Sequence, residues 1–127
     1  MARKIIATDK APAAVGPYSQ AVLADGWLFV SGQIGIDPGT GKMAEGGTVA
    51  EFRQVLSNLK AVVEAAGGNL QTIVRATLYL IDMNEFAAVN AVYAESFKES
   101  PPARECVAVA ALPKGARCEM SVIARIQ

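Results

Sequence analysis

Residues 101–126, PPARECVAVAALPKGARCEMSVIARI, contain two apolar runs joined by the turn-like segment Leu112-Pro113-Lys114-Gly115. Short apolar runs bounded by proline and glycine are typical of β-strands, so this stretch predicts two strands that close the chain. The first run begins with Arg104 and Cys106, and the second contains Glu119 near its start. A guanidinium on one strand and a carboxylate on its neighbour form either a surface ion pair or a working site.

Side chains alternate between the two faces of a β-strand. The more apolar face of the last strand is therefore predicted to carry Cys118, Met120, Val122, Ala124 and Ile126, and the other face Arg117, Glu119, Ser121, Ile123 and Arg125. Glu119 then either pairs with Arg117 or Arg125 or belongs to a site. Arg104 is either a solvated residue at a strand edge or an anion-binding group, because a guanidinium recognises carboxylates through two parallel hydrogen bonds.

The other candidate residues are ambiguous when each is taken alone. Cys106 fits a small core residue, since the sequence has no histidine to activate a thiol. Asn90 fits a buried, hydrogen-bonded helix residue, and Tyr18 and Ser31 fit ordinary strand residues. The residues by themselves predict a fold outline and a candidate anion site, without a reaction.

Four strands and two helices are predicted upstream. The strands cover residues 3–8, 18–23, 27–34 and 73–81, with a hairpin turn at Asp25-Gly26. Thr48 and Glu51 have the spacing of a capping box, and apolar residues at helical spacing continue to Gly67-Gly68. Asp82 and Glu85 open a second helix, which runs to about Lys98 with the stripe Phe86, Asn90, Tyr93 and Phe97.

The resulting order, β-β-β-α-β-α-β-β, predicts an α+β or α/β layer of two helices on one sheet. Two helices cover only one sheet face. The other face is predicted to carry Trp27, Phe29, Ile73, Tyr79 and the odd-numbered residues of the last strand. Leaving this apolar surface in water costs about 25 cal/mol per Å². The pattern therefore predicts an oligomer formed through the uncovered face.

Composition excludes several classes of function. The 127 residues predict a single domain, 1–127, in which 12 Lys and Arg balance 12 Asp and Glu. Zero net charge argues against nucleic-acid and anionic-membrane partners. The lack of histidine argues against a metal site, and two cysteines form no disulfide framework, which favours the cytoplasm. The N-terminal segment is too polar for a signal-peptide core, and no apolar run is long enough to span a membrane.

Four separated motifs resemble the signatures of the RidA (YjgF) family, the reactive intermediate or 2-iminobutanoate/2-iminopropanoate deaminases. They are Gly16-Pro17-Tyr18-Ser19-Gln20-Ala21, Ser31-Gly32-Gln33-Ile34, Pro102-Ala103-Arg104-Glu105-Cys106-Val107 and Leu112-Pro113-Lys114-Gly115. The resemblance runs from Ile5 to the final strand. It implies a chorismate-mutase-like two-layer sandwich, a mixed sheet packed by two helices, assembled as a homotrimer with clefts between subunits.

The resemblance also assigns roles to residues. It implies that Arg104 holds the carboxylate of a 2-imino acid, that Glu119 positions or activates water, and that no cofactor or metal is needed. Further substrate-binding residues carried over in this way are Tyr18, Ser31, Gly32, Asn90 and Cys106. Glu105 departs from the serine or alanine found in many members, and strand alternation points it away from Arg104.

Three functions are compatible with this resemblance. The leading one is hydrolysis of 2-iminobutanoate and 2-iminopropanoate to 2-oxo acids and ammonia. The alternative is a non-catalytic member that binds small carboxylates or acts like a chaperone. A ribonuclease or translation-inhibitor activity has also been attached to the family, and the zero net charge and the absence of a basic-aromatic stripe argue against it.

Overall fold

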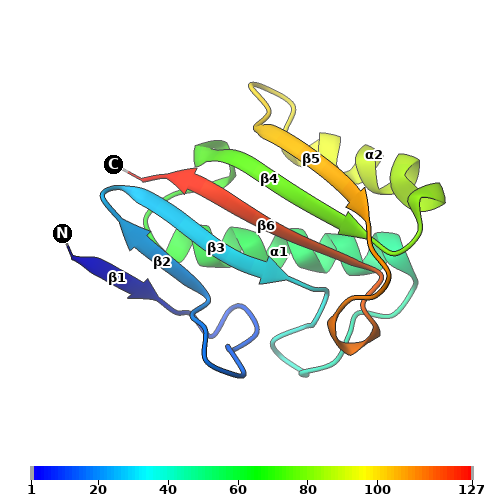
Figure 1. Ribbon diagram of the computed structural model, residues 1–127, viewed down its shortest axis with the longest axis horizontal. Coiled ribbons are helices and arrows are strands. Elements are labelled where there is room, and N and C mark those ends of the chain that lie inside the picture. Colours follow the sequence, from blue (N-terminus) through cyan, green and yellow to red (C-terminus); the bar gives the residue numbers. More distant parts are fainter. Residues whose placement is uncertain (1, 127) are drawn as a thin grey trace.

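A computed structural model describes residues 2–126 as one six-stranded sheet with two α-helices behind it (Figure 1). The strands are β1 (Arg3–Ile6), β2 (Ala21–Ala24), β3 (Trp27–Gln33), β4 (Ile73–Leu80), β5 (Ala103–Ala108) and β6 (Cys118–Arg125). The helices are α1 (Thr48–Ala65) and α2 (Phe86–Ser96), with 3-10 turns η1 (Leu70–Thr72), η2 (Met83–Glu85) and η3 (Pro113–Gly115). The predicted order of elements and the α+β class are confirmed.

The strand order is β1-β2-β3-β6-β4-β5, so the two closing strands are not neighbours. β4 and β5 pair in parallel, and β6 returns antiparallel between β3 and β4. The expectation that the two closing strands pair with each other is wrong. A parallel β4–β5 pair requires a crossover, which α2 provides, and the chain then crosses back over β4 (Figure 1).

The core lies between the sheet and α1. Fully buried side chains of α1, among them Phe52, Leu59 and Val62, pack in one apolar cluster with Leu78 of β4 and Met120 of β6. The even-numbered residues of β6 are buried from Cys118 to Ala124, which confirms the predicted alternation. The odd-numbered residues, Glu119 included, therefore face the side of the sheet that carries no helix.

The helix ends agree with the sequence only in part. Gly67 has a positive φ of 95°, and the amides of Gly67 and Gly68 donate to the last turn of α1, as predicted. The capping box is wrong, because the N-cap of α1 is Gly47 and no side chain caps it. The second helix is shorter than predicted, since η2 occupies its first turn and α2 ends at Ser96.

The uncovered face carries large apolar side chains. Trp27 and Phe29 are 41% and 49% exposed, and Tyr79 is half-buried on the same side. Ile73 was predicted on this face, but only 4% of its surface is exposed. An irregularity in the β4–β6 pairing between Ile73 and Arg75 shifts the register and turns Ile73 into the core.

Candidate functional site

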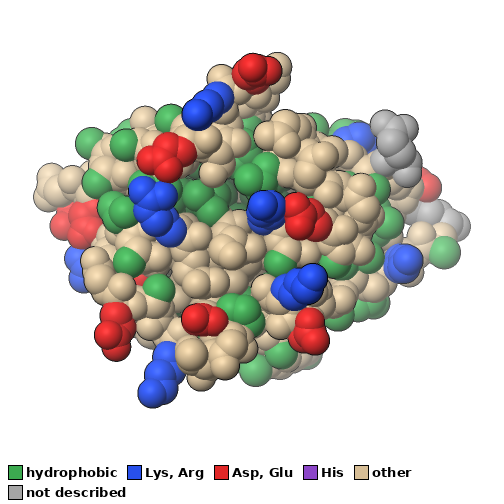
Figure 2. Space-filling view, turned by 180° about the vertical axis from the view of Figure 1, so that it is seen from behind, with side chains coloured by type: hydrophobic (Ala, Val, Ile, Leu, Met, Phe, Trp, Pro, Cys, Tyr) green, Lys and Arg blue, Asp and Glu red, His purple; other side chains and the backbone are tan. Residues whose placement is uncertain are grey.

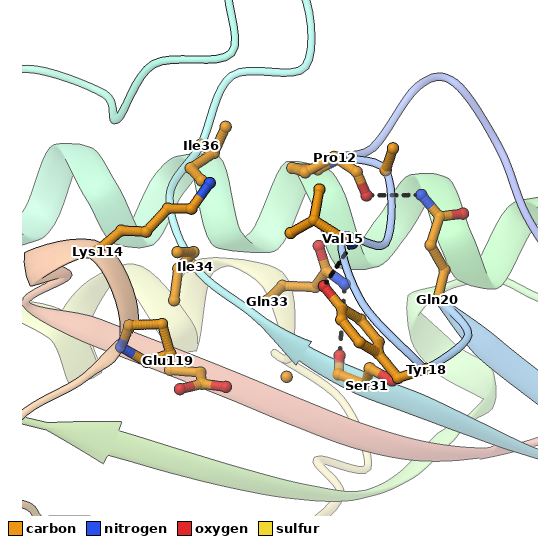
Figure 3. Close-up of a pocket in the computed structure, with 13 residues that line it drawn as sticks. Pro12, Val15, Tyr18, Gln20, Ser31, Gln33, Ile34, Ile36, Lys114 and Glu119 are labelled. Carbon is orange, nitrogen blue, oxygen red and sulfur yellow. Dashed lines mark hydrogen bonds between the residues drawn. The ribbon is translucent and has the colours of Figure 1, made fainter.

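A pocket of about 490 Å³ lies beside the end of β3, between the loop of residues 12–18, η3 and the start of β6 (Figure 3). It collects four of the predicted site residues, which come from three separate segments of the chain. They are Tyr18, Ser31, Gly32 and Glu119. Arg104, Asn90 and Cys106 are absent from its lining.

Glu119 is the acidic group of this pocket, and its side chain is half-buried. Burial raises the pKa of its carboxyl above the ordinary value of 4.5, because desolvation disfavours the charged form. Among residues 2–126, no side chain forms an ion pair with this carboxylate, and no hydrogen bond to it counteracts the effect of burial on its pKa. A carboxyl with a raised pKa and open access to a pocket is suited to carrying a proton to and from a reactant.

Gly32 lies directly against Glu119. A Cβ atom at residue 32 would lie 2.9 Å from Glu119 Cδ and overlap one of its carboxylate oxygens. The β3–β6 pairing is irregular between Val30 and Gln33, so the backbone bulges at this point. Glycine lets the Glu119 side chain lie against the backbone of β3 here, and a larger residue would push the flexible end of that side chain aside.

Ser31 and Tyr18 form the opposite wall of the pocket. Ser31 Oγ donates to the carbonyl oxygen of Ser19 at 2.6 Å, which ties β3 to the segment before β2. Tyr18 is 51% exposed, and its hydroxyl accepts a hydrogen bond from the amide of Val15 at 3.5 Å (Figure 3). Tyr18 was predicted to begin a strand, but β2 begins only at Ala21, so Tyr18 belongs to the loop.

Two buried amide side chains, Gln20 and Asn58, hold these walls in place. Neither was a candidate site residue from the sequence. Gln20 is 4% exposed; it accepts from the amide of Thr8 at 2.7 Å and donates to the carbonyl of Pro12 at 2.7 Å. Asn58 of α1 is fully buried and donates to the carbonyls of Ile34 and Ile36. A buried carboxamide needs partners, so each fixes an irregular segment beside the pocket.

The remaining candidates form a second cluster between β5 and α2. Arg104 Nη1 donates to Asn90 Oδ1 at 2.7 Å. Its guanidinium carbon lies 4.6 Å from the ring centre of Tyr93 and 5.4 Å from that of Phe86. Three residues of the predicted apolar face, Phe86, Asn90 and Tyr93, thus surround Arg104. Their two aromatic rings and one amide restrict the orientation of the guanidinium.

Cys106 is half-buried beside this arginine. Burial raises the pKa of its thiol, and the charge of Arg104 opposes the rise only in part. The thiol is therefore protonated at neutral pH and is a poor nucleophile. Glu105 points to the other face and pairs with Arg75, as strand alternation predicted.

Arg104 and Glu119 do not meet within one copy of the chain. Arg104 lies in register with Ala76, which is buried beneath the helices, whereas Glu119 lies in register with Tyr79 on the uncovered face. The ion pairs with Arg117 or Arg125 that the sequence offered as alternatives for Glu119 are wrong, because neither forms among residues 2–126. Arg117 binds Glu85 at 2.7 Å, and Arg125 donates to the carbonyl of Asp25 and stacks on Trp27.

The charges on the helix side of the molecule are mixed in sign. Figure 2 shows lysine and arginine side chains interspersed with aspartate and glutamate over this face, without a continuous positive stripe. Neither α-helix within residues 2–126 combines the length and the hydrophobicity of a membrane span.

Comparisons with known proteins agree with one another. The model of the family described as "Endoribonuclease L-PSP" matches residues 8–126. A goat (Capra hircus) protein named 2-iminobutanoate/2-iminopropanoate deaminase is 51% identical over 98% of this chain and 90% of its own. A crystal structure of a Rid-family protein from Yersinia pestis superimposes with a TM-score of 0.96 at 45% identity, covering 98% of this chain and 100% of that one. RidA from an Antarctic Psychrobacter gives 0.93 at 47% identity, over 97% and 99%.

Proposed function

Because the chain belongs to the endoribonuclease L-PSP family, the family of the RidA (YjgF) proteins, we propose that it is an imine deaminase. It hydrolyses 2-iminobutanoate and 2-iminopropanoate to the corresponding 2-oxo acids and ammonia. The name of the goat relative supports this substrate class. The observation that carries the proposal is the half-buried carboxylate of Glu119, which forms no ion pair among residues 2–126 and is set against Gly32 in a pocket with Tyr18 and Ser31.

The active unit is a homotrimer whose sites lie between copies. Two observations support this assembly: Trp27 and Phe29 leave an apolar sheet face exposed, and Arg104 and Glu119 of one copy point to opposite faces. A site that needs both groups is completed when Arg104 of one copy approaches the Glu119 pocket of its neighbour. The 490 Å³ pocket of a single copy is then half of a cleft.

Each group has one task in the reaction. The guanidinium of Arg104, already oriented by Asn90 and Tyr93, binds the carboxylate of the imino acid through a bidentate pair of hydrogen bonds. Binding the carboxylate fixes the distance from the adjacent C=N carbon to Glu119. Tyr18 and Ser31 supply hydroxyl groups that orient the substrate and water. Cys106 contributes shape and backbone groups, since its thiol stays protonated.

Hydrolysis proceeds by addition and elimination. The carboxylate of Glu119 takes a proton from water as the water oxygen bonds to the C=N carbon, and passes this proton to the imine nitrogen to give a carbinolamine. The carboxylate then takes the proton of the new hydroxyl group and delivers it to the amino nitrogen as the C–N bond breaks, which releases ammonia and leaves the C=O of the 2-oxo acid. One carboxyl group carries protons in both directions, which its raised pKa favours.

The decisive experiment measures ammonia release while a dehydratase generates the imino acid in the same solution. We expect the wild-type protein to accelerate release and Glu119→Gln to remove the acceleration without unfolding the protein. A non-catalytic carboxylate-binding protein would bind 2-oxobutanoate in a calorimeter and give no excess ammonia with either variant. That result would replace the proposal with the binding alternative, which the comparisons do not favour.

A ribonuclease activity is not favoured, despite the name of the family. The net charge is zero, and charges of both signs are interspersed on the helix side (Figure 2).

We place the protein in the cytoplasm, since both cysteines are free thiols and one of them, Cys118, is fully buried.

A further inference from the structure

Arg117, the residue two positions before Glu119, is held by three acceptors from two other segments. Its Nε donates to Thr48 Oγ1 at 2.7 Å, and its Nη2 donates to Glu85 Oε1 at 2.7 Å. Its backbone amide donates to Glu51 Oε1 at 2.9 Å. Thr48 and Glu51 belong to the first turn of α1, and Glu85 to η2, so the side chain of Arg117 is drawn toward the ends of the helices.

Arg117 is the cation nearest to Glu119 along the chain. Without these acceptors its side chain would be free to approach the Glu119 carboxylate. Residues i and i+2 of an extended segment lie on the same side, which is why the sequence predicts an Arg117–Glu119 pair. The structure replaces that pair with the one between Arg117 and Glu85. An opposite charge within 4–6 Å lowers a carboxyl pKa by about 1–3 units.

The other groups that face Glu119 form no ion pair with it among residues 2–126. Lys114 of η3 lines the same pocket, as does Tyr18 of the loop, and Tyr79 lies opposite Glu119 on β4. The β3 residues beside it, from Ser31 to Gln33, carry no charge. In the proposed assembly, Arg104 of the neighbouring copy faces the same cleft, and its charge is paired with the substrate carboxylate once the substrate binds.

We infer that Glu85 and Thr48 are positioning residues, which hold the Arg117 side chain at the helix ends and so keep its charge away from Glu119. This inference rests on the proposed function, because it concerns the basicity of the group that activates water. A carboxylate paired with arginine is a weaker base and takes a proton from water less readily. The two acceptors thereby protect the reactivity of Glu119 without touching substrate.

The test is a direct titration of the Glu119 carboxyl by carbon-13 NMR, assigned from the signal missing in Glu119→Gln. We compare wild type, Glu85→Ala, Glu85→Ala/Arg117→Met and the control Glu95→Ala, which removes an exposed partner of Arg53. Glu85→Ala is expected to lower the Glu119 pKa by about one unit, since Arg117 is released. Adding Arg117→Met restores the wild-type value, and Glu95→Ala leaves it unchanged.

Activity gives an independent readout. The acid limb of the kcat/KM profile is expected to move to lower pH in Glu85→Ala by the same amount as the NMR titration, and to return in the double variant. If Glu85→Ala fails to fold, Thr48→Val, which removes the hydroxyl that accepts from Arg117 Nε and hydrogen-bonds the Glu85 carboxyl but keeps the Arg117–Glu85 ion pair, gives a smaller fall in the same direction. An unchanged Glu119 pKa in the folded variants overturns the inference. If Glu119→Gln keeps full activity, the proposed function fails instead, while the titration still reports on Arg117.

Discussion

Arg104 and Glu119 point to opposite faces of the same sheet, although they lie on strands separated only by β4. Arg104 is cradled by α2 on the helix side, and Glu119 faces the side without helices. We therefore predict that a reaction using a guanidinium for the substrate carboxylate and a carboxyl for water draws these two groups from two copies of the chain. This relationship joins the chemistry of the site to the assembly of the protein.

The guanidinium of Arg104 should be needed for its shape as well as its charge. We expect Arg104→Ala to lower kcat/KM on the order of a hundredfold, since losing a charged partner of a carboxylate costs about 3 kcal/mol. Arg104→Lys keeps the charge and loses the planar pair of N–H donors, so its kcat/KM should lie between those of wild type and Arg104→Ala. Steady-state ammonia release checks both, with the exposed Arg53→Ala as a matched control. Full activity of Arg104→Ala would contradict the assigned role.

Gly32 should be coupled energetically to Glu119. A methyl group at residue 32 overlaps the Glu119 carboxylate, so Gly32→Ala should displace the carboxylate and destabilise the protein by at most about 1 kcal/mol, because the end of this side chain can move. In a Glu119→Ala background the same change should cost little. Denaturant unfolding of the four proteins in this double-mutant cycle measures the coupling. Equal costs in the two backgrounds would show that the two residues do not press on each other.

The pH dependence of stability should reveal the burial of Glu119. Its folded pKa is raised, so the ionised form is penalised and stability is lost as the pH rises through that value. Glu119→Gln should therefore melt at a higher temperature than wild type at pH 7, and the difference should shrink below the ordinary carboxyl pKa. A lower melting temperature for Glu119→Gln at pH 7 would indicate a hidden partner for the carboxylate.

Glu85 should behave in the opposite way. Hydrogen bonds from Thr48 and Arg117 lower the pKa of its carboxyl, so it contributes stability above its ordinary pKa that is lost as the pH falls through the lowered value. Glu85→Gln should thus be less stable than wild type at pH 7, with the gap closing in acid. Calorimetric scans from pH 3 to 7 check both glutamates in one series.

The uncovered sheet face should hold the oligomer together. Phe29 is 49% exposed in a single copy, and an interface would bury it. Phe29→Glu places a charge there, so we expect light scattering to give trimers for wild type and monomers for this variant, together with lost activity. A Phe29→Glu protein that stays trimeric and active would contradict this role of the uncovered face.

Local patterns in the sequence were sufficient for much of this fold. The alternation of β6 placed Glu119 on the uncovered face, and Gly67-Gly68 marked the end of α1, because both features depend on residues close together in the chain. The motif resemblance brought Tyr18, Ser31, Gly32 and Glu119 together, and the pocket contains all four. Their individual roles remain predictions.

What the sequence could not supply depends on long-range contacts. The sequence predicts Thr48 as a helix cap. In the structure its hydroxyl instead accepts a hydrogen bond from the guanidinium of Arg117, 69 residues further along the chain. The insertion of β6 between β3 and β4 follows from the crossover through α2, which no local pattern encodes. The turn of Ile73 into the core depends on an irregularity in pairing with β6. Each error arose where a distant partner overrode a local preference.

The central claim is that Arg104 and Glu119 of one site come from different copies, and subunit complementation tests it most directly. Arg104→Ala and Glu119→Gln, each inactive alone, are unfolded together in equal amounts and refolded. In a symmetric trimer of randomly mixed copies, about one quarter of the clefts regain both native residues, so about one quarter of wild-type ammonia release should return. If both residues of a site belonged to one copy, mixing would restore no activity, and that result would contradict the account.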